Sequence, residues 1–535
     1  MNYDTLYYPY PSRRMAVYAS NGIVATSQIL AAQAGLDILK KGGNAIDAAI
    51  ATAACLTVVE PPSNGIGGDA FALVWTGGKL YGLNSSGPAP KSISAEIVRE
   101  AGYNEMPRYG WIPVTVPGTP AAWAELAKRF GKLPLAKTLE PAIEYAEKAY
   151  PVSPCVAKFW KSYFDDAAKE LKHEQYASFF ETFGINRNAP EAGQIWRCSD
   201  LSKTLISIAE TNAESFYRGN LADKIHAFSK KYGGYISGDD LEEYEPEWVE
   251  PININYRGYD VWEIPPNGQG LVALMALNIL KGFEFHSRED PDTCHKQLEA
   301  MKLAFADGSK YITDSKYMNV KVQDLLSEAY AEERRKLIGK TALEPTPGQP
   351  MTGGTVYLAA ADKEGNMISY IQSNYQGFGS GLVVPETGIA LQNRGSCFSV
   401  DPDHINCLEP GKRTYHTIIP GFLTKDGNPI GPFGVMGGFM QPQGHVQVVM
   451  NTIDFKLNPQ AALDAPRWQW LKGKSVTLER SYAEYIAGYL ERIGHNINWT
   501  LEPNIFGRGQ IIWKEENGVF CAGTDPRTDS AVAAW

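Results

Sequence analysis

Gly353, Gly354 and Thr355 form the part of the sequence best suited to covalent chemistry. A threonine hydroxyl is a weak nucleophile unless a base lies close enough to take its proton. Cleavage of the Gly354–Thr355 bond would free the α-amine of Thr355, whose pKa of about 8 suits it to act as that base. The glycines allow the turn in which the hydroxyl attacks the preceding carbonyl. The tripeptide therefore predicts a nucleophile created by cleavage, although it also fits an ordinary junction between a loop and a strand.

The residues around this tripeptide predict a loop followed by a β-hairpin. Residues 341–354 are rich in Pro and Gly, which disfavour a helix or a central strand and indicate an exposed linker. Residues 355–375 contain two strand-like runs separated by the turn sequence DKEGN. Thr355 is therefore expected at the first position of a strand.

Two helices are expected near the N-terminus. Apolar residues recur at helical spacing from Ile29 to Leu39, after Ser27 as a candidate N-cap. Asn44 can cap a second helix over about residues 45–57. Because this second helix is apolar nearly all round, we expect it to be buried between two layers.

A glycine-rich loop at residues 65–69 precedes a predicted strand at residues 71–75. A dinucleotide-binding loop would need the order strand, loop, helix and the spacing GxGxxG, and the sequence has neither here. The loop is therefore interpreted as a structural turn. From about residue 120 to residue 345 the pattern is mainly helical, with a strand and a turn over residues 256–270.

The composition of the chain excludes several classes of protein and of binding partner. The 535 residues carry a net charge of -10 without a basic cluster, which argues against a nucleic-acid partner. Neither a signal peptide nor an apolar run long enough to span a membrane is evident. The seven cysteines are scattered without a CxxC pair, which favours a reducing cytoplasm. The histidines lack metal-binding spacing. We therefore expect a cytoplasmic protein without a metal, a cofactor or a membrane partner.

Several longer motifs occur in collinear order from about residue 20 to the C-terminus. They are GGNAIDAAIA (42–51), VVEPPSNGIGGDAF (58–71), VPGTPAAW (116–123), EAMKLAFAD (299–307), LQNRGSCFS (391–399), PGKRTYHTIIP (410–420), VMGGFMQPQGH (435–445) and the ending TDPRTDSAVAAW. Together these motifs closely resemble the γ-glutamyltransferase family. The resemblance implies an α+β fold of the N-terminal-nucleophile hydrolase type, a four-layer αββα sandwich. It also implies a precursor that cleaves itself into a large region, 1–354, and a small region, 355–535, which together form one structural unit.

The resemblance also assigns roles to individual residues. Thr355 matches the catalytic threonine of the family, and the cleavage site lies between Gly354 and Thr355. Gly437 and Gly438 match the glycine pair whose backbone N–H groups stabilise the oxyanion. Ser373 matches a second hydroxyl that hydrogen-bonds to the nucleophile. Without the resemblance, a Gly-Gly pair would be interpreted as a turn.

The sequence departs from the family at the positions that bind the α-amino-acid head of a γ-glutamyl group. There the family has an Arg and a serine pair for the carboxylate, and amides and an acid for the ammonium. The corresponding residues in this chain are Asn84, Tyr375, Arg394, Cys397, His416 and Thr417. An ammonium left without its acid would bind poorly, whereas an arginine adds a bidentate partner for a carboxylate.

These departures predict an acyl group that carries a carboxylate and does not need an α-ammonium. A glutaryl-like chain fits, since some family members resemble cephalosporin or glutaryl acylases in this region. The alternative is that Arg394 pairs with a carboxylate of the protein, such as Glu386 or Asp401.

The sequence therefore predicts a hydrolase that cleaves small-molecule amides bearing a carboxylate through a threonine acyl-enzyme. Two alternatives stay open. One is true γ-glutamyl transfer from glutathione-like donors, and the other is a non-catalytic binding protein that never matures. The expected macromolecular partners are the chain's own two fragments, and a homodimer is one assembly that the sequence allows.

Overall fold

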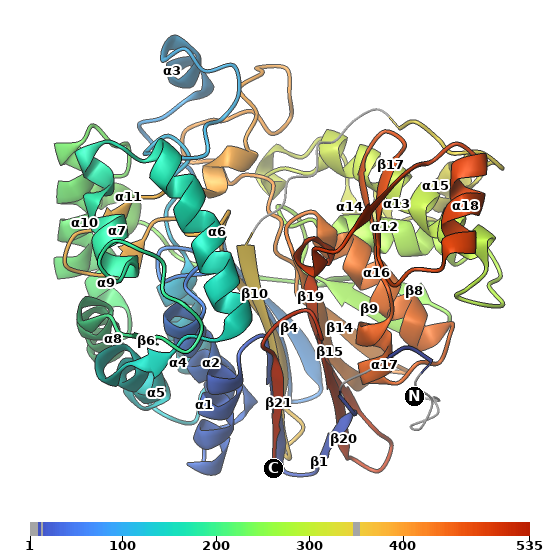
Figure 1. The fold of residues 1–535 in the computed structure, drawn as a ribbon, viewed down its shortest axis with the longest axis horizontal. Coiled ribbons are helices and arrows are strands. Elements are labelled where there is room, and N and C mark those ends of the chain that lie inside the picture. Colours follow the sequence, from blue (N-terminus) through green and yellow to red (C-terminus); the bar gives the residue numbers. More distant parts are fainter. Residues whose placement is uncertain (1–8, 12–13, 346–353) are drawn as a thin grey trace.

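Two antiparallel sheets of seven strands each face one another at the centre of the protein (Figure 1). The computed structural model describes residues 9–11, 14–345 and 354–535. The first sheet has the order β1 (Val17–Ala19), β20 (Phe520–Thr524), β19 (Arg508–Lys514), β15 (Asn428–Met436), β14 (Gly421–Lys425), β9 (Tyr259–Glu263) and β8 (Ile252–Tyr256). The second has the order β21 (Ala531–Ala534), β2 (Gly22–Thr26), β10 (Gly354–Asp362), β11 (Met367–Tyr375), β3 (Asp69–Thr76), β4 (Lys79–Ser85) and β7 (Glu247–Val249).

Strand β10 shows why the sheets pack into layers. Its residues are buried throughout, and successive side chains point to opposite faces of the sheet. Tyr357 and Ala359 belong to the apolar core between the two sheets, whereas Val356 and Leu358 belong to the core beneath the helices. Thr355 shares the parity of Tyr357, so its side chain faces the space between the sheets. A strand that is apolar on both faces therefore fits only in the middle of a layered structure.

Helices cover the outer face of each sheet, on the left and on the right in Figure 1. On the second sheet lie α1 (Ile29–Lys40), α2 (Ala45–Val59), α4 (Thr119–Phe130), α5 (Leu135–Lys148), α6 (Pro154–Glu170), α7 (Ala177–Phe183), α8 (Ser199–Thr211), α9 (Glu214–Arg218), α10 (Asn220–Lys231) and α11 (Gly238–Glu242). On the first sheet lie α12 (Gly270–Leu280), α13 (Pro291–Tyr311), α15 (Glu328–Arg335), α16 (Met440–Ile453), α17 (Pro459–Asp464) and α18 (Glu484–Arg492). The expected α+β class and the four-layer αββα order are confirmed. No helix in the described ranges is both long and apolar enough to cross a bilayer.

The helix caps test the sequence analysis in detail. Helix α2 is buried at every position, as its apolar composition predicts, and Asn44 caps it in a reciprocal pair with Asp47. The N-cap prediction for α1 is wrong, because Gln28 occupies that position without a side-chain bond. The Ser27 hydroxyl donates instead to the Glu60 carboxylate at 2.5 Å. A buried carboxylate needs a donor more than a helix end does, because the first backbone N–H groups of a helix can be satisfied in other ways.

The predicted hairpin is confirmed, and its strands are β10 and β11. Strand β10 begins at Gly354, one residue before the expected start. The predicted linker, residues 341–354, lies partly outside the described residues, as does Gly353. Strands β10 and β11 lie between β2 and β3, so each sheet combines strands from the residues before and after Thr355.

Candidate functional site

Two hydroxyl groups surround the peptide carbonyl that precedes Thr355. The Thr355 Oγ1 donates to the Gly354 carbonyl oxygen at 2.8 Å, and the Ser373 Oγ donates to the same oxygen at 2.7 Å. The two hydroxyl oxygens are 3.0 Å apart, and the Tyr375 amide donates to that of Ser373. The sequence-predicted pair, Thr355 and Ser373, is thus brought together at the predicted cleavage site. A hydroxyl held beside a polarised carbonyl is suited to attack it.

Gly437 and Gly438 lie between the end of strand β15 and the start of helix α16. Their φ angles are 139° and 60°, which glycine adopts without strain. Their carbonyl groups accept from Met440 N and Gln441 N, while the bonds found within the described residues include none donated by their own amides. Amides in this position, at the N-terminus of a helix, can bind an anion.

A cavity of about 1060 Å³ opens next to these groups and is lined by Gly354 and Gly437. Arg508 also lines it, and its Nη1 donates to the Glu60 carboxylate at 2.8 Å. The Nη2 of Arg508 reaches the Thr355 carbonyl oxygen at 3.5 Å. The cavity is within the size range of small-molecule sites and gives access to the carbonyl group of Gly354.

Arg394 is fully buried, and only some of its hydrogen-bond donors have a partner in the described part of the chain. Its Nη1 donates to Thr417 Oγ1 at 2.8 Å and to the Cys397 sulfur at 3.7 Å, and its guanidinium lies 4.2 Å from the centre of the Tyr375 ring. Its Nε and Nη2 have no hydrogen-bond partner among the described residues. A buried guanidinium with two free donors is costly unless a ligand accepts from them.

The alternative acids for Arg394 do not meet it. Among the described residues no hydrogen bond or ion pair joins Arg394 to Glu386 or to Asp401, both of which are exposed. Glu386 instead lies 3.9 Å from Lys224. These two acids are thus excluded as partners of Arg394, although the buried Asp69 carboxylate is close enough to act on it electrostatically. The Nε and Nη2 donors stay available for another acceptor.

A buried histidine and aspartate lie near Arg394. The Nε2 of His416 is 3.0 Å from Asp69 Oδ2, and its Nδ1 accepts from the Ile418 amide. Burial raises the pKa of Asp69 to about 7, while the positive charge of Arg394 opposes that rise. Burial, with the same charge, lowers the pKa of His416 well below its usual value. The imidazole is therefore neutral at pH 7 and presents its Nε2–H to Asp69.

Asn84 makes no described contact with Thr355 or Arg394. Its amide donates to Asn267 Oδ1 at 2.9 Å, and its carbonyl accepts from Ser86. Asn267 in turn accepts from the His416 amide through its backbone carbonyl. Asn84 therefore supports the loop that carries His416, and the prediction that it faces a substrate has no contact in its favour.

Three side chains that join the predicted residues carry no signal in the sequence. Gln269 donates from Nε2 to the carbonyl groups of Thr417 and Gly438, at 2.6 and 2.8 Å, and so connects the Arg394 region to the glycine pair. Asp69 belongs to the GIGGD loop that was interpreted only as a turn, and Arg508 is isolated in the sequence. Their partners are far away along the chain, so spacing gave no signal for them.

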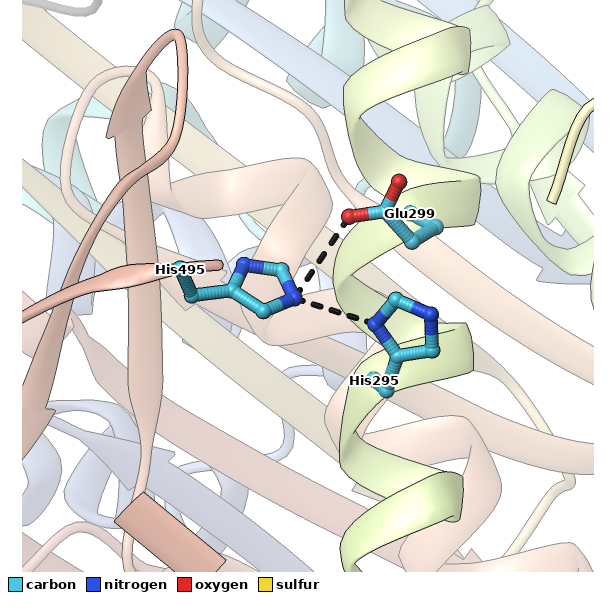
Figure 2. A group of neighbouring side chains, drawn as sticks. All are labelled: His295, Glu299 and His495. Carbon is cyan, nitrogen blue, oxygen red and sulfur yellow. Dashed lines mark hydrogen bonds and ion pairs between the residues drawn. The ribbon is translucent and has the colours of Figure 1, made fainter. Parts of the chain in front are cut away.

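A further cluster of buried polar residues joins helix α13 to His495, which follows helix α18 (Figure 2). His295, Glu299 and His495 place possible metal-ligand atoms within 4.8 Å of one another. The ammonium of Lys302 already lies 2.7 Å from Glu299 Oε1 and 3.4 Å from His495 Nδ1. A metal ion would therefore compete with a resident cation.

The hydrogen bonds of this cluster hold residues 339–343 in place. The carbonyl of Gly339 accepts from His295, and that of Leu343 accepts from Lys302. The Leu343 amide donates to Glu299 at 2.9 Å. Burial, with the charge of Lys302, lowers the pKa of His495 to about 3, so its ring is neutral and can accept from Lys302. These contacts give the cluster a structural role, which is to hold residues 339–343 against helix α13.

Comparison with known proteins identifies the family from which these features come. The family model described as gamma-glutamyltranspeptidase matches residues 31–535. A glutathione hydrolase-like YwrD proenzyme of Bacillus subtilis is 35% identical, over 97% of this chain and 99% of that protein. An oxamate amidohydrolase proenzyme of Klebsiella pneumoniae is 33% identical, over 97% of this chain and 99% of that protein.

Solved structures agree with the sequence relatives. A cephalosporin acylase from Bacillus halodurans is 65% identical, covers 100% of this chain and 99% of its own, and superposes with a TM-score of 0.96. The gamma-glutamyltranspeptidase of Helicobacter pylori is 30% identical, with a TM-score of 0.56 over 62% of this chain and 94% of its own. The fold is therefore that of the N-terminal-nucleophile hydrolases.

Proposed function

Because this chain belongs to the γ-glutamyltranspeptidase family of hydrolases and acylases, we propose that Thr355 is its nucleophile. In this proposal the chain cuts itself between Gly354 and Thr355, giving fragments of residues 1–354 and 355–535. The observation that carries it is the pair of hydroxyls of Thr355 and Ser373 around the Gly354 carbonyl oxygen. Two of the relatives are named as proenzymes, which supports the cleavage.

The proposed reaction has two steps and uses the same groups twice. The α-amine of Thr355 takes the proton of its hydroxyl, which attacks an amide carbonyl and forms an ester-linked acyl-enzyme. The tetrahedral oxyanion binds to the amides of Gly437 and Gly438, and the place of Gly437 in the cavity wall supports this role. The departing amine takes the proton. Water then attacks the ester and releases the acid.

Arg394 supports a substrate whose acyl group carries a carboxylate. Its two free donors are buried, and Thr417 and Tyr375 fix the guanidinium in place. An oxyanion accepting from both donors would satisfy them, in the bidentate geometry that guanidinium and carboxylate share. Oxamate, after which one relative is named, has a carboxylate next to its amide. A glutaryl-like acyl group, which the departures from the family predict, carries its carboxylate further from the amide.

The rival function is γ-glutamyl transfer from glutathione-like donors. Other relatives are named glutathione hydrolases, such as that of Escherichia coli at 29% identity over 97% of this chain. That substrate adds an α-ammonium, which needs a nearby acid. Asp69 is close enough to interact with Arg394 electrostatically, but it already bonds to His416 and Gln392. Within the described ranges, the acid that acts on Arg394 is thus already bonded to other side chains, which favours the acylase reaction over transfer.

Paired chromogenic amides test the substrate directly. We expect the purified protein to hydrolyse glutaryl-p-nitroanilide with a higher kcat/KM than γ-glutamyl-p-nitroanilide, because the two differ only in the ammonium. An uncharged butyryl-p-nitroanilide measures the contribution of the carboxylate. A strong preference for the γ-glutamyl amide would refute the acylase proposal and favour transfer. Hydrolysis of neither charged amide, in an uncut chain, would favour a non-catalytic binding protein.

A further inference from the structure

Arg508 contacts Thr355 directly and is held by buried polar groups of the N-terminal region. It is the first residue of strand β19 and pairs in register with Met436, next to Gly437. Its Nη1 bonds to Glu60 at 2.8 Å, its Nη2 to Ser63 Oγ at 3.3 Å, and the same Nη2 to the Thr355 carbonyl oxygen at 3.5 Å. The guanidinium therefore lies between an acid and the candidate nucleophile.

Packing fixes the guanidinium in this position. Glu60 is completely buried and accepts from Ser27 with its other oxygen at 2.5 Å. The Phe159 ring lies 4.8 Å from the guanidinium carbon. Because Arg508 lines the cavity together with Gly354 and reaches the Thr355 carbonyl oxygen, its guanidinium is close to the amine that cleavage would create. A buried, immobilised charge acts strongly on a neighbouring ionisable group, because water screens it little.

We propose that Arg508, held by Glu60, is a positioning residue that fixes the backbone of Thr355 and keeps its new α-amine uncharged. This inference rests on the proposed cleavage. The amine and the carbonyl belong to the same residue, so the amine lies within a few ångströms of the guanidinium. A nearby positive charge disfavours the ammonium form and lowers the pKa of the amine. An uncharged amine is the form that can take the proton of the hydroxyl.

Other charged groups also face this amine, and each differs from Arg508 in burial or in its partners. The charged residues that line the cavity with Arg508 are Glu105, Arg108, Lys158, Asp166 and Glu502, all at least partly exposed. Lys158 and Glu502 pair with each other at 2.6 Å. Beyond strand β11, Asp69 is engaged by His416. Arg508 and Glu60 are thus the buried charges expected to dominate the pKa of the amine.

The test is the acidic limb of the pH profile of kcat/KM, which reports the pKa of a base in the free enzyme. Arg508→Gln removes a positive charge, so the limb should move to higher pH by about one unit. Glu60→Gln removes a negative charge and should move it to lower pH. Arg508→Lys keeps the charge and should leave the limb within about 0.3 units of the parent. Opposite shifts are the signature that a merely structural role would not produce.

Arg257→Gln is the matched control. Arg257 forms an ion pair with Asp454 that also joins the two regions, at 2.5 Å and away from the cavity. This variant should lose stability as the Arg508 and Glu60 variants do, but the acidic limb of its pH profile should not move. Intact-mass measurement of every protein separates the two hypotheses, since an uncut and inactive parent refutes the proposed function itself. The other outcome is a parent that is cut and active while the acidic limbs of the Arg508 and Glu60 variants do not move, or move in the same direction. That result overturns only the role of Arg508. If Arg508→Gln stays uncut, Glu60→Gln decides between the outcomes. A shift of its acidic limb to lower pH supports the role of Arg508, and no shift or a shift to higher pH overturns it.

Discussion

At the scale of single residues, the site depends on which buried polar groups are satisfied and which are not. The hydroxyls of Thr355 and Ser373 are both engaged with the Gly354 carbonyl oxygen. Arg394 is buried as deeply, yet its Nε and Nη2 have no partner in the part of the chain that the structure describes. Protein interiors rarely leave a charged donor unsatisfied, so these donors support the proposal that Arg394 binds the carboxylate of a substrate.

Arg394→Gln should lower kcat/KM for a glutaryl amide by about tenfold to a hundredfold, since a charged hydrogen bond contributes about 1.5–3 kcal/mol. Activity on the butyryl amide should change little, because that acyl group has no carboxylate to bind. Thr417→Val is the companion variant, since it removes the hydroxyl that orients the guanidinium. Equal losses on the charged and uncharged amides would contradict a role in carboxylate recognition. Steady-state kinetics with both substrates makes the comparison.

Asp69 gives a stability prediction that depends on pH. Because its folded pKa is raised to about 7, the folded state holds a proton that the unfolded state has lost above about pH 4. Its contribution to stability is thus greatest at low pH and decreases as pH rises from about 4 to 7. The unfolding temperature of the parent should therefore fall relative to that of Asp69→Asn as the pH rises over that interval. If the unfolding temperature of the parent instead rises relative to that of Asp69→Asn, the pKa of Asp69 is lowered and not raised.

At the scale of secondary structure, the sequence predicted the elements whose cause is local. The hairpin of β10 and β11 follows from its turn, and helix α2 follows from its cap and its all-round apolar composition. Ser27 was misassigned because its partner, Glu60, is distant in the sequence. Arg508, Gln269 and Asp69 were missed for the same reason. The sequence motifs predicted Thr355 and Ser373, but contacts between segments far apart in the chain could be found only in the structure.

The cluster on helix α13 yields a prediction for that element. Lys302→Met would leave Glu299 buried without its cation, and breaking such a pair typically costs about 3–5 kcal/mol. A large fall in unfolding temperature is expected, together with faster proteolysis near residues 339–343, which the cluster holds in place. Lys296→Met is a matched control on the same helix, because its ion pair with Asp292 is partly exposed. Equal stability of the two variants would contradict the structural role of the cluster.

At the scale of the whole molecule, the fold makes the two fragments of the proposed cleavage inseparable without unfolding. Strands β10 and β11 follow Thr355, yet they lie between β2 and β3, which precede it. The first sheet is mixed in the same way. Loss of one peptide bond leaves the pairing of these strands and the apolar cores on both faces of the sheets in place.

We therefore expect the cut protein to migrate as one species in size-exclusion chromatography without denaturant and to separate into two bands under denaturing electrophoresis. The two fragments should unfold in a single transition, because their strands share both sheets. Fragments that separate under native conditions would contradict the interleaved sheets.

Intact-mass spectrometry of the purified protein tests the central claim most directly. The account predicts two masses, those of residues 1–354 and 355–535, with threonine as the new N-terminus of the smaller fragment. Thr355→Ala should give the single mass of the uncut chain and no hydrolysis of glutaryl-p-nitroanilide. A parent that stays uncut while it hydrolyses the amide, or a Thr355→Ala variant that is cut and active, would contradict the assignment of Thr355 as the nucleophile.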